Sequence, residues 1–269
     1  MATAARSGAV RTTLREYGDL ASFSFGTFKD LPGSARYVSE ILRQTAILIR
    51  GSTFAIFVLP FFLGVTQTNY GYYTLRAAGA GDYAGLVSGV ATPRLSALFA
   101  LGYIFAAKVG CGLVSEIGAM RVNEEIDAYE AEAISPRQYV AGTRVLAALL
   151  YSPIAAGVGI FGATVGSYVN VVYILNAVSA ETFNRYHWSN QAPFDYLFGF
   201  IVSMIVMATI VYVACFYGFR TTGGPAGVGA ASARSLVVNL VAIHVITGLA
   251  AFAVYGPSLG LPIGGVGSG

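Results

Sequence analysis

Acidic side chains are concentrated in one short stretch of this chain. From Glu116 to Glu132, 17 positions hold six of the 13 acidic residues, although charged residues make up only 11% of the sequence. The apolar positions of the stretch recur at the spacing of one helix face. Because the cytoplasmic leaflet of a membrane is itself negative, six carboxylates are repelled by a lipid surface. The stretch therefore predicts a water-exposed helix over residues 116–134 that faces another protein.

Other residue types that commonly do chemistry are few and scattered. His187 and His244 are separated by a loop and an apolar run, and no Cys/His cluster has the spacing of a metal site. Cys111 and Cys215 lie in apolar runs, where they behave as small hydrophobic residues. The glycine-rich segment 218–229 lacks the Gly-Lys-Ser/Thr of a P-loop. These patterns argue against metal, redox and nucleotide chemistry, and they favour a tight turn at 218–230.

A few charged or titratable residues lie inside apolar runs or at their ends. In a membrane such residues face a cavity, bind a neighbouring helix or snorkel to the interface. Arg50 is close to the start of a run, which favours snorkelling. Lys108 has small neighbours that permit packing into the bundle, but it could equally snorkel to the cytoplasmic side. His244 is either a hydrogen-bonded packing residue or part of a polar pathway.

The composition of the chain is that of an integral membrane protein. Hydrophobic residues make up 55% of the sequence, and the mean hydropathy is +0.65. Residues 1–43 contain several charges and no continuous apolar run, so they do not resemble a cleavable signal peptide. We therefore expect an all-α membrane protein whose N-terminus is cytoplasmic.

The apolar runs predict the membrane spans. Runs long enough to cross a bilayer cover 46–65, 95–114, 144–178, 195–217 and 235–255. The third would extend about 52 Å as a single helix, so it is either a helix bent near Pro153 or a tight hairpin. With five spans, the inside segments hold 11 Arg/Lys and the outside segments hold two, whereas the hairpin gives 10 and three. The charge distribution favours five spans.

The segments that flank the spans define the remaining organisation. In residues 1–45, Leu14, Tyr17, Phe25 and Phe28 recur at helical spacing, which predicts a helix that ends near Pro32. This helix either lies in the membrane interface or packs on the cytoplasmic side of the bundle. Residues 46–255 form the transmembrane domain, and 256–269 are expected to be a flexible tail.

Two separated motifs resemble a known family. The run EIGAMRVNEEIDAYE at 116–130, followed by Ser135-Pro136 and by RVLA at 144–147, is similar to the central motif of the MlaE/YrbE permeases that serve Mce-type lipid transporters. The run GGPAGVG at 223–229, followed by Arg234-Ser235, resembles the family's second motif. The resemblance extends from about Arg94 to Tyr255, and it looks closest to the B-type YrbE of paired actinobacterial systems.

The resemblance assigns roles to several residues. It implies that the 116–134 helix is a coupling helix that docks on a cytoplasmic ATPase. The residues expected at that contact are Glu116, Ile117, Met120, Arg121, Glu124, Glu125, Asp127 and Glu130. Lys108 falls where the family often has arginine, and Arg94 falls on the arginine of its Arg-Glu-Leu-Gly-Pro motif, so both are candidates for the lipid pathway. Leu95 and Leu98 replace the acid and the proline of that motif.

The resemblance also implies a function and a set of partners. The chain is expected to be a non-catalytic permease subunit of an ATP-driven lipid transporter in a bacterial inner membrane. It would hold no cofactor, because ATP and magnesium bind to the partner ATPase. The other expected partners are a second permease (an A-type YrbE paralogue, otherwise a second copy), Mce-domain proteins on the outer side and the lipid substrate, with no nucleic acid.

Two other classes of protein remain as alternatives. A secondary transporter would normally carry an intramembrane acid or histidine for ion coupling, and no acid lies deep in a predicted span. A structural membrane scaffold would leave the acidic stretch and the glycine-rich turn without a mechanical function.

Overall fold

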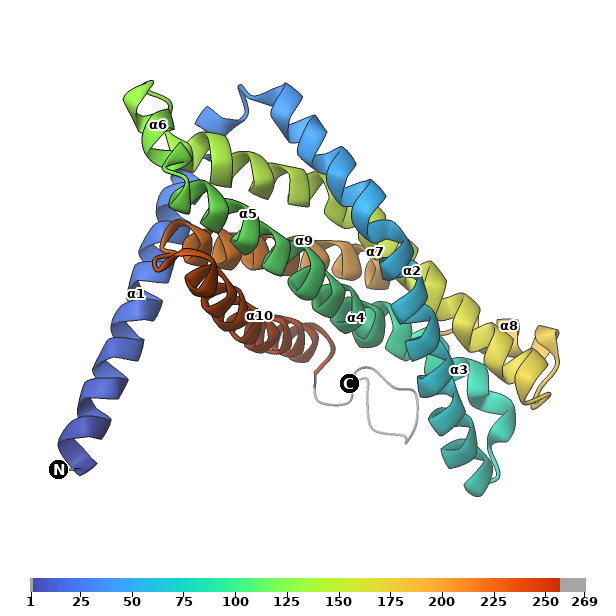
Figure 1. Cartoon of the computed structure of the whole chain (residues 1–269). Helices are drawn as coiled ribbons and strands as arrows, with labels where there is room; N and C mark the ends of the chain where they lie inside the picture. The colour runs from blue at the N-terminus through green and yellow to red at the C-terminus, as the bar shows by residue number, and fades with distance from the viewer. Residues whose placement is uncertain (1, 257–269) are drawn as a thin grey trace. The chain divides into compact units, whose positions relative to one another are not determined.

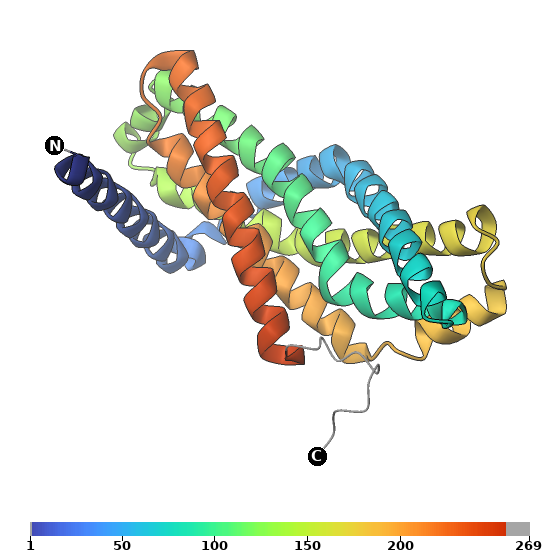
Figure 2. The ribbon, with the colours of Figure 1, turned by 90° about the horizontal axis from the view of Figure 1, so that it is seen from below.

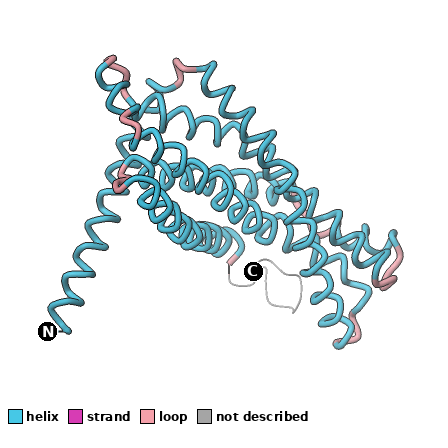
Figure 3. The backbone as a smooth tube through the Cα atoms, viewed as in Figure 1, coloured by secondary structure: helices cyan, strands magenta, loops and turns pink. Residues whose placement is uncertain are grey.

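The computed structural model describes residues 2–256, with side chains described from residue 15 onward, and every regular element in that part of the chain is a helix (Figures 1 and 3). The α-helices are α1 (Ala2–Ser34), α2 (Val38–Ala77), α3 (Ala84–Ala91), α4 (Ala97–Ile104), α5 (Cys111–Val122), α6 (Glu125–Ala131), α7 (Thr143–Tyr168), α8 (Ala180–Trp188), α9 (Pro193–Phe219) and α10 (Gly224–Tyr255). Shorter elements are the 3₁₀ turn η1 (Gly81–Tyr83) and the π-helical η2 (Thr92–Ser96), η3 (Phe105–Gly110), η4 (Arg137–Gly142) and η5 (Val169–Ile174).

Five helical segments in the described residues are long and apolar enough to cross a membrane. They are Val38–Ala77, Gly81–Val122, Arg137–Ile174, Pro193–Phe219 and Gly224–Tyr255. A helix satisfies its own backbone hydrogen bonds, which a bilayer core requires of any spanning segment. The prediction of an all-α membrane protein with five spans is confirmed. The hairpin alternative is wrong, because η4, α7 and η5 form one continuous helical segment.

The chain divides into two compact units. Unit 1 comprises Met1–Leu48, Ala106–Leu150 and Ala208–Asn239, and unit 2 comprises the rest of the chain. Every span has residues in both units. Unit 1 therefore holds the connection between the second and third spans and the connection between the fourth and fifth spans, whereas unit 2 holds the other two connections. Five crossings require this alternation.

The core of unit 2 includes a close approach of α2 and α7. A Cβ at Gly64 would overlap the carbonyl of Ala163, and a Cβ at Gly166 would overlap that of Phe61, so both positions need glycine. Small residues allow helix backbones in a membrane to come together in this way. Asn170 adds a polar link, because its Nδ2 donates to the carbonyl of Val65 at 3.1 Å.

Helices α3 and α8 lie side by side in unit 2 (Figures 1 and 2). Ser179 caps the start of α8, where its hydroxyl accepts a hydrogen bond from the Thr182 amide at 3.1 Å. Phe183 and His187, one turn apart, are buried, and Gly89 of α3 provides room for the backbone of His187. The pair is thus packed around a buried histidine.

In unit 1, α1 ends at Ser34, as the position of Pro32 predicts. One face of α1 packs on the end of α9, where Phe23 contacts the rings of Phe216 and Phe219. The predicted apolar stripe points away from this contact, because Tyr17, Phe25 and Phe28 are all exposed. The helix therefore packs on the chain and still presents an apolar face, so an interfacial position stays a prediction. The predicted tail lies, from residue 257 onward, outside the described residues.

Candidate functional site

The acidic stretch of residues 116–132, called the acidic segment below, is not one helix. Helix α5 ends at Val122 and α6 starts at Glu125, whereas the sequence predicted a continuous helix over 116–134. Glu124 adopts a left-handed conformation with φ of 60°, and Ala133 does so with φ of 59°. Residues other than glycine rarely adopt this backbone conformation, which changes the direction of the chain locally. The break turns the acidic segment into a compact helix-turn-helix.

Carboxylates cover the outer side of the acidic segment. The acids in α6 and its flanking turns are all exposed, namely Glu124, Glu125, Asp127, Glu130 and Glu132. Ile117 and Ile126, by contrast, are 0% and 2% exposed. Ile117 packs against Gly218 within unit 1, so it supports the acidic segment and has no surface for a partner. Met120 is half-buried and Arg121 is exposed. Of the residues predicted at a contact, the charged ones are therefore available.

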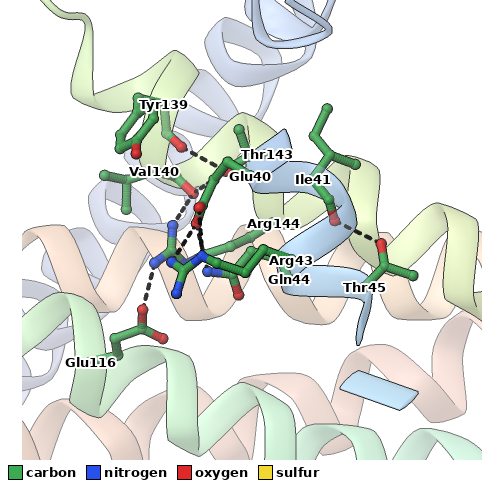
Figure 4. Close-up of polar contacts among 10 residues, drawn as sticks. All are labelled: Glu40, Ile41, Arg43, Gln44, Thr45, Glu116, Tyr139, Val140, Thr143 and Arg144. Carbon is green, nitrogen blue, oxygen red and sulfur yellow. Dashed lines mark hydrogen bonds and ion pairs between the residues drawn. The ribbon is translucent and has the colours of Figure 1, made fainter. Parts of the chain in front are cut away.

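A buried arginine fixes the base of the acidic segment (Figure 4). Arg144, at the start of α7, is 5% exposed. Its Nη2 donates to Oε1 of Glu116 on α5 at 2.5 Å, and its Nη1 donates to the carbonyl of Val140 at 2.9 Å. The charge-assisted hydrogen bond ties α5 to α7 across the acidic segment. Glu116 keeps about half of its side chain exposed, so it joins the buried cation to the outer surface.

A second charge cluster comes from the first turns of α2. Arg43 binds Glu40 in a bidentate manner, with donor–acceptor distances of 2.7 and 2.8 Å, and Gln44 donates to the same carboxylate at 2.8 Å. Figure 4 shows these residues beside Arg144. Both clusters line a cavity of about 400 Å³ together with Glu125 and two tyrosines of unit 1. The cavity thus opens beside the acidic segment and carries three carboxylates against two guanidinium groups.

Two tyrosines, Tyr129 and Tyr139, line this cavity. Burial, with a smaller contribution from nearby Tyr139, raises the pKa of the Tyr129 phenol above its ordinary value. The rings of Tyr129 and Tyr139 are 5.3 Å apart. No group of His, Cys, Asp and Glu suited to a metal ion occurs in the part of the chain that the structure describes. The cavity therefore lies beside an exposed acidic surface.

Arg94, predicted to act in a lipid pathway, belongs to unit 2, whereas the acidic segment belongs to unit 1. Its side chain is 10% exposed and binds Asp195 of α9, with Nε–Oδ1 at 3.1 Å and Nη2–Oδ2 at 3.2 Å. Asp195 also accepts hydrogen bonds from the Ala192 amide at 2.9 Å and the Tyr255 hydroxyl at 2.7 Å. The guanidinium stacks over the Tyr255 ring, 4.6 Å from its centre. Asp195 thus occupies the bidentate position that a lipid headgroup would need.

The remaining polar residues of the spans have definite positions. Lys108 lies in η3 and is exposed on the surface of the chain, so it is not packed inside the chain's own helices. His244 is hydrogen-bonded, because its Nδ1 donates to the Leu240 carbonyl at 2.8 Å and its Nε2 accepts from the Tyr103 hydroxyl at 2.9 Å. These bonds agree with a hydrogen-bonded packing residue.

Comparison with known families identifies the chain. A family model described as Permease MlaE matches residues 41–253. The chain belongs to the MlaE permease family. A probable ABC transporter permease of Rickettsia felis is 28% identical over 228 residues, which cover 84% of this chain and 87% of that protein. The MlaE permease of the intermembrane phospholipid transport system of Haemophilus influenzae is 25% identical over 232 residues, covering 83% and 85%. The chloroplastic protein TRIGALACTOSYLDIACYLGLYCEROL 1 of Arabidopsis thaliana is 28% identical over 145 residues, covering 53% and 40%.

Sequence reasoning about this MlaE-family permease missed four charged residues, three at the cavity beside the acidic segment and one at Arg94. Arg144 stands at the start of an apolar run, and an arginine in that place signals a buried cation that needs an acid. Glu40 and Arg43 are three residues apart, a spacing that permits a pair on one helix face. Asp195 was assigned to the edge of a span. No sequence signal joins it to Arg94, which is 101 residues away.

Proposed function

We propose that this MlaE-family permease is a subunit of an ATP-driven lipid transporter and couples to a separate ATPase through the acidic segment. Two features support the coupling role. The exposed acids form a dense negative surface that a membrane leaflet would repel, and the Glu116–Arg144 pair anchors this surface to α7. A force that the partner applies to the acidic segment would therefore pass through Glu116 and Arg144 to the spanning helix α7.

The orientation and partners belong to the same proposal. Unit 1 lies in the cytoplasm-facing half of the bilayer and beyond it, since most of the Arg/Lys in the connections belongs to unit 1. The N-terminus is then cytoplasmic in a bacterial inner membrane. A second permease, an A-type YrbE paralogue or otherwise a second copy, completes the lipid path, and Mce-domain proteins continue it on the outer side. ATP and magnesium bind to the ATPase, and this chain contributes no catalytic group.

The lipid path involves two basic residues in this proposal. Lys108 is exposed within a span, where an uncompensated ammonium is costly, so it faces either the second permease or a headgroup. Arg94 acts on a headgroup only if a phosphate or carboxylate replaces Asp195. The bidentate geometry seen with Asp195 is the one that such a group would use.

A charge reversal tests the coupling role. Glu124→Lys together with Glu125→Lys, expressed with the cognate ATPase, should abolish copurification of the ATPase and its lipid-stimulated hydrolysis, while the permease still inserts. Because exposed charges of the acidic segment would make the contact, the wild-type complex should also dissociate near 1 M salt, where the Debye length is about 3 Å. Asp82→Lys with Glu181→Lys reverses two exposed charges in unit 2 and should leave the complex intact. Unchanged copurification of the first variant would refute coupling through the acidic segment.

A secondary transporter is less compatible with the same geometry. Asp195 is the buried acid that such a transporter would use, but it accepts from Arg94, Ala192 and Tyr255 at once. Protonation of Asp195 would leave the Arg94 guanidinium buried beside a neutral group, which is strongly unfavourable. A proton-coupled cycle at this residue would therefore work against its own hydrogen-bond network.

A further inference from the structure

A second cavity in unit 1 lies outside the acidic segment and has no part in the proposed coupling. It has a volume of about 380 Å³, within the range of roughly 300–1,000 Å³ that is typical of small-ligand sites. Its charged and polar lining comes from α1, the end of α9 and the start of α10, and includes Arg15, Glu16, Asp19, Tyr217, Arg220 and Arg234. Three guanidinium groups therefore surround a space that contains two carboxylates.

The two carboxylates are already engaged by the chain. Glu16 accepts a hydrogen bond from the Tyr217 hydroxyl at 2.8 Å, and Asp19 binds Arg220 at 3.0 Å. Arg220 is further held over the Phe216 ring, 4.6 Å from its centre. Among the described residues, neither Arg15 nor Arg234 forms an ion pair or a side-chain hydrogen bond. The cavity thus has three guanidinium groups against two carboxylates, a net charge of +1, and neither Arg15 nor Arg234 is held by an acid of the described lining.

The backbone adds positive potential on the same side. Helix α10 starts at Gly224, so the Gly-Pro-Ala-Gly run that was predicted to be a turn is its first turn. Gly227 of this turn lines the cavity. The first amides of an α-helix have no partner within the helix, and the aligned peptide dipoles make this end positive. The arginines and the start of α10 together favour an anion with several oxygens.

The position of the cavity along the spans indicates the source of the anion. The cavity lies where α9 ends and α10 begins, and the ends of membrane spans lie at the level of the lipid headgroups. Helix α1 contributes Arg15 to the cavity and carries the exposed aromatic rings of Tyr17 and Phe25 on another face. Aromatic side chains of this kind favour the interface. We propose that this cavity binds a phosphate group at the membrane surface, supplied by the headgroup of an anionic phospholipid.

A binding titration tests this site on the full-length protein in detergent, and it needs neither the ATPase nor transport. Dihexanoyl phosphatidylglycerol is added, and the bound lipid is counted by native mass spectrometry. Parallel titrations use dihexanoylglycerol, which lacks the phosphate, and sodium phosphate. We expect saturable binding of phosphatidylglycerol and none of dihexanoylglycerol. Sodium phosphate that competes over the same concentration range as the lipid would instead identify free phosphate as the source of the same group.

Matched variants decide whether the bound lipid occupies this cavity. Arg15→Gln with Arg234→Gln should weaken phosphatidylglycerol binding about tenfold or more, because each removes a charge-assisted contact. Lys29→Gln with Arg36→Gln removes the same charge from unit 1 outside the cavity and should leave the affinity within about twofold. Thr222→Glu keeps both arginines, lies at an exposed position of the lining and should give the same loss by repulsion, which covers the case in which the double variant fails to fold.

Three results would overturn the proposal. They are unchanged binding in the folded Arg15/Arg234 and Thr222 variants, an equal loss in the Lys29/Arg36 control, and equally strong binding of dihexanoylglycerol. A fourth is also decisive. If the Arg15/Arg234 variant retains the lipid but loses the ATPase, the cavity receives an acidic part of the protein partner instead.

Discussion

Two ion pairs, one in each unit, differ sharply in their exposure to water. In unit 1, the Arg121–Asp127 pair of the acidic segment joins side chains that are 40% and 55% exposed. In unit 2, the Arg94–Asp195 pair joins side chains that are 10% and 2% exposed, and a tyrosine hydroxyl and a backbone amide complete the carboxylate. Water competes for the first pair and is excluded from the second. Charge at the acidic segment is thus available to a partner, whereas charge at Arg94 holds elements of one unit together.

Loss of one partner of the buried Arg94–Asp195 pair should have the largest effect on stability. Arg94→Leu or Asp195→Leu leaves one buried charge without its counter-ion, which costs about 3–5 kcal/mol of stability. The double variant Arg94→Leu/Asp195→Leu removes both charges and should be more stable than either single variant. Thermal unfolding of the purified protein at low and high salt measures these differences, and the loss should change little with salt.

A contrasting result at this pair would assign it a different function. If Arg94→Lys and Arg94→Leu both retain wild-type stability but lose lipid-stimulated ATP hydrolysis, then Asp195 is a replaceable ligand and Arg94 acts on the headgroup. Tyr255→Phe serves as the mild control, since it removes one hydrogen bond to Asp195 at a cost of about 1 kcal/mol while the ring stays over the guanidinium.

A buried histidine makes unit 2 sensitive to pH. His187 is 1% exposed, and burial lowers the pKa of its imidazole from 6.5 to about 4. Its Nε2 accepts from Gln191 at 3.0 Å, and Gln191 in turn accepts from the Tyr196 hydroxyl, so the proton of His187 is on Nδ1. Because the folded pKa is depressed, its contribution is fully present above pH 6.5 and is lost as the pH falls toward about 4. The loss is at most about 3 kcal/mol.

Unfolding measured from pH 7 to about pH 4 tests this effect. His187→Gln should flatten the slope of stability against pH, although it lowers stability at neutral pH. The chain contains only two histidines, and His244 is exposed, so His244→Gln is the matched control and should keep the slope. Hydrogen exchange would place the loss in α3 and α8, which pack around His187. An unaltered slope in the His187 variant would mean that carboxylates alone set the acid sensitivity.

The spans and the acidic surface could be predicted from the sequence because both depend on local composition. Runs of about 20 apolar residues have few alternatives to a membrane helix, and four of the five predicted runs lie within observed helical segments. The third predicted run, 144–178, extends past the end of its segment at Ile174. The density of acids between Glu116 and Glu132 likewise predicted that these side chains are exposed to water. Charge counting favoured one long third span over a hairpin, and the continuous η4–α7–η5 segment confirms that choice.

The rest depends on local strain and on distant pairs. The break of the acidic segment at Glu124 requires a left-handed glutamate, and nothing in the run Val-Asn-Glu-Glu demands one. The glycine-rich run predicted a turn over 218–230. Within that run, positive φ angles occur at Gly223 and Gly224, and helix α10 begins immediately, with Pro225 in its first turn. The match of Arg94 with Asp195, like that of Arg144 with Glu116, is decided by packing of separate spans, which a single sequence does not reveal.

The exposed pair provides the smallest effect and the sharpest contrast with Arg94. Arg121 Nη1 lies 2.5 Å from Asp127 Oδ1, but both side chains are substantially hydrated, so their mutual coupling should be about 0.2–1 kcal/mol. A double-mutant cycle with Arg121→Ala and Asp127→Ala measures this coupling by unfolding, and it should shrink toward zero near 1 M salt, where charges beyond about 3 Å are screened. The same two variants should change binding of the ATPase in opposite directions. Asp127→Ala removes a negative charge that the partner would contact and should weaken binding, whereas Arg121→Ala removes a cation that opposes the contact and should strengthen it. A coupling above about 2 kcal/mol that persists in salt would show that the Arg121–Asp127 pair holds the acidic segment together, as Arg94 and Asp195 hold elements of unit 2. The proposed distinction between the exposed pair and the buried pair would then be wrong.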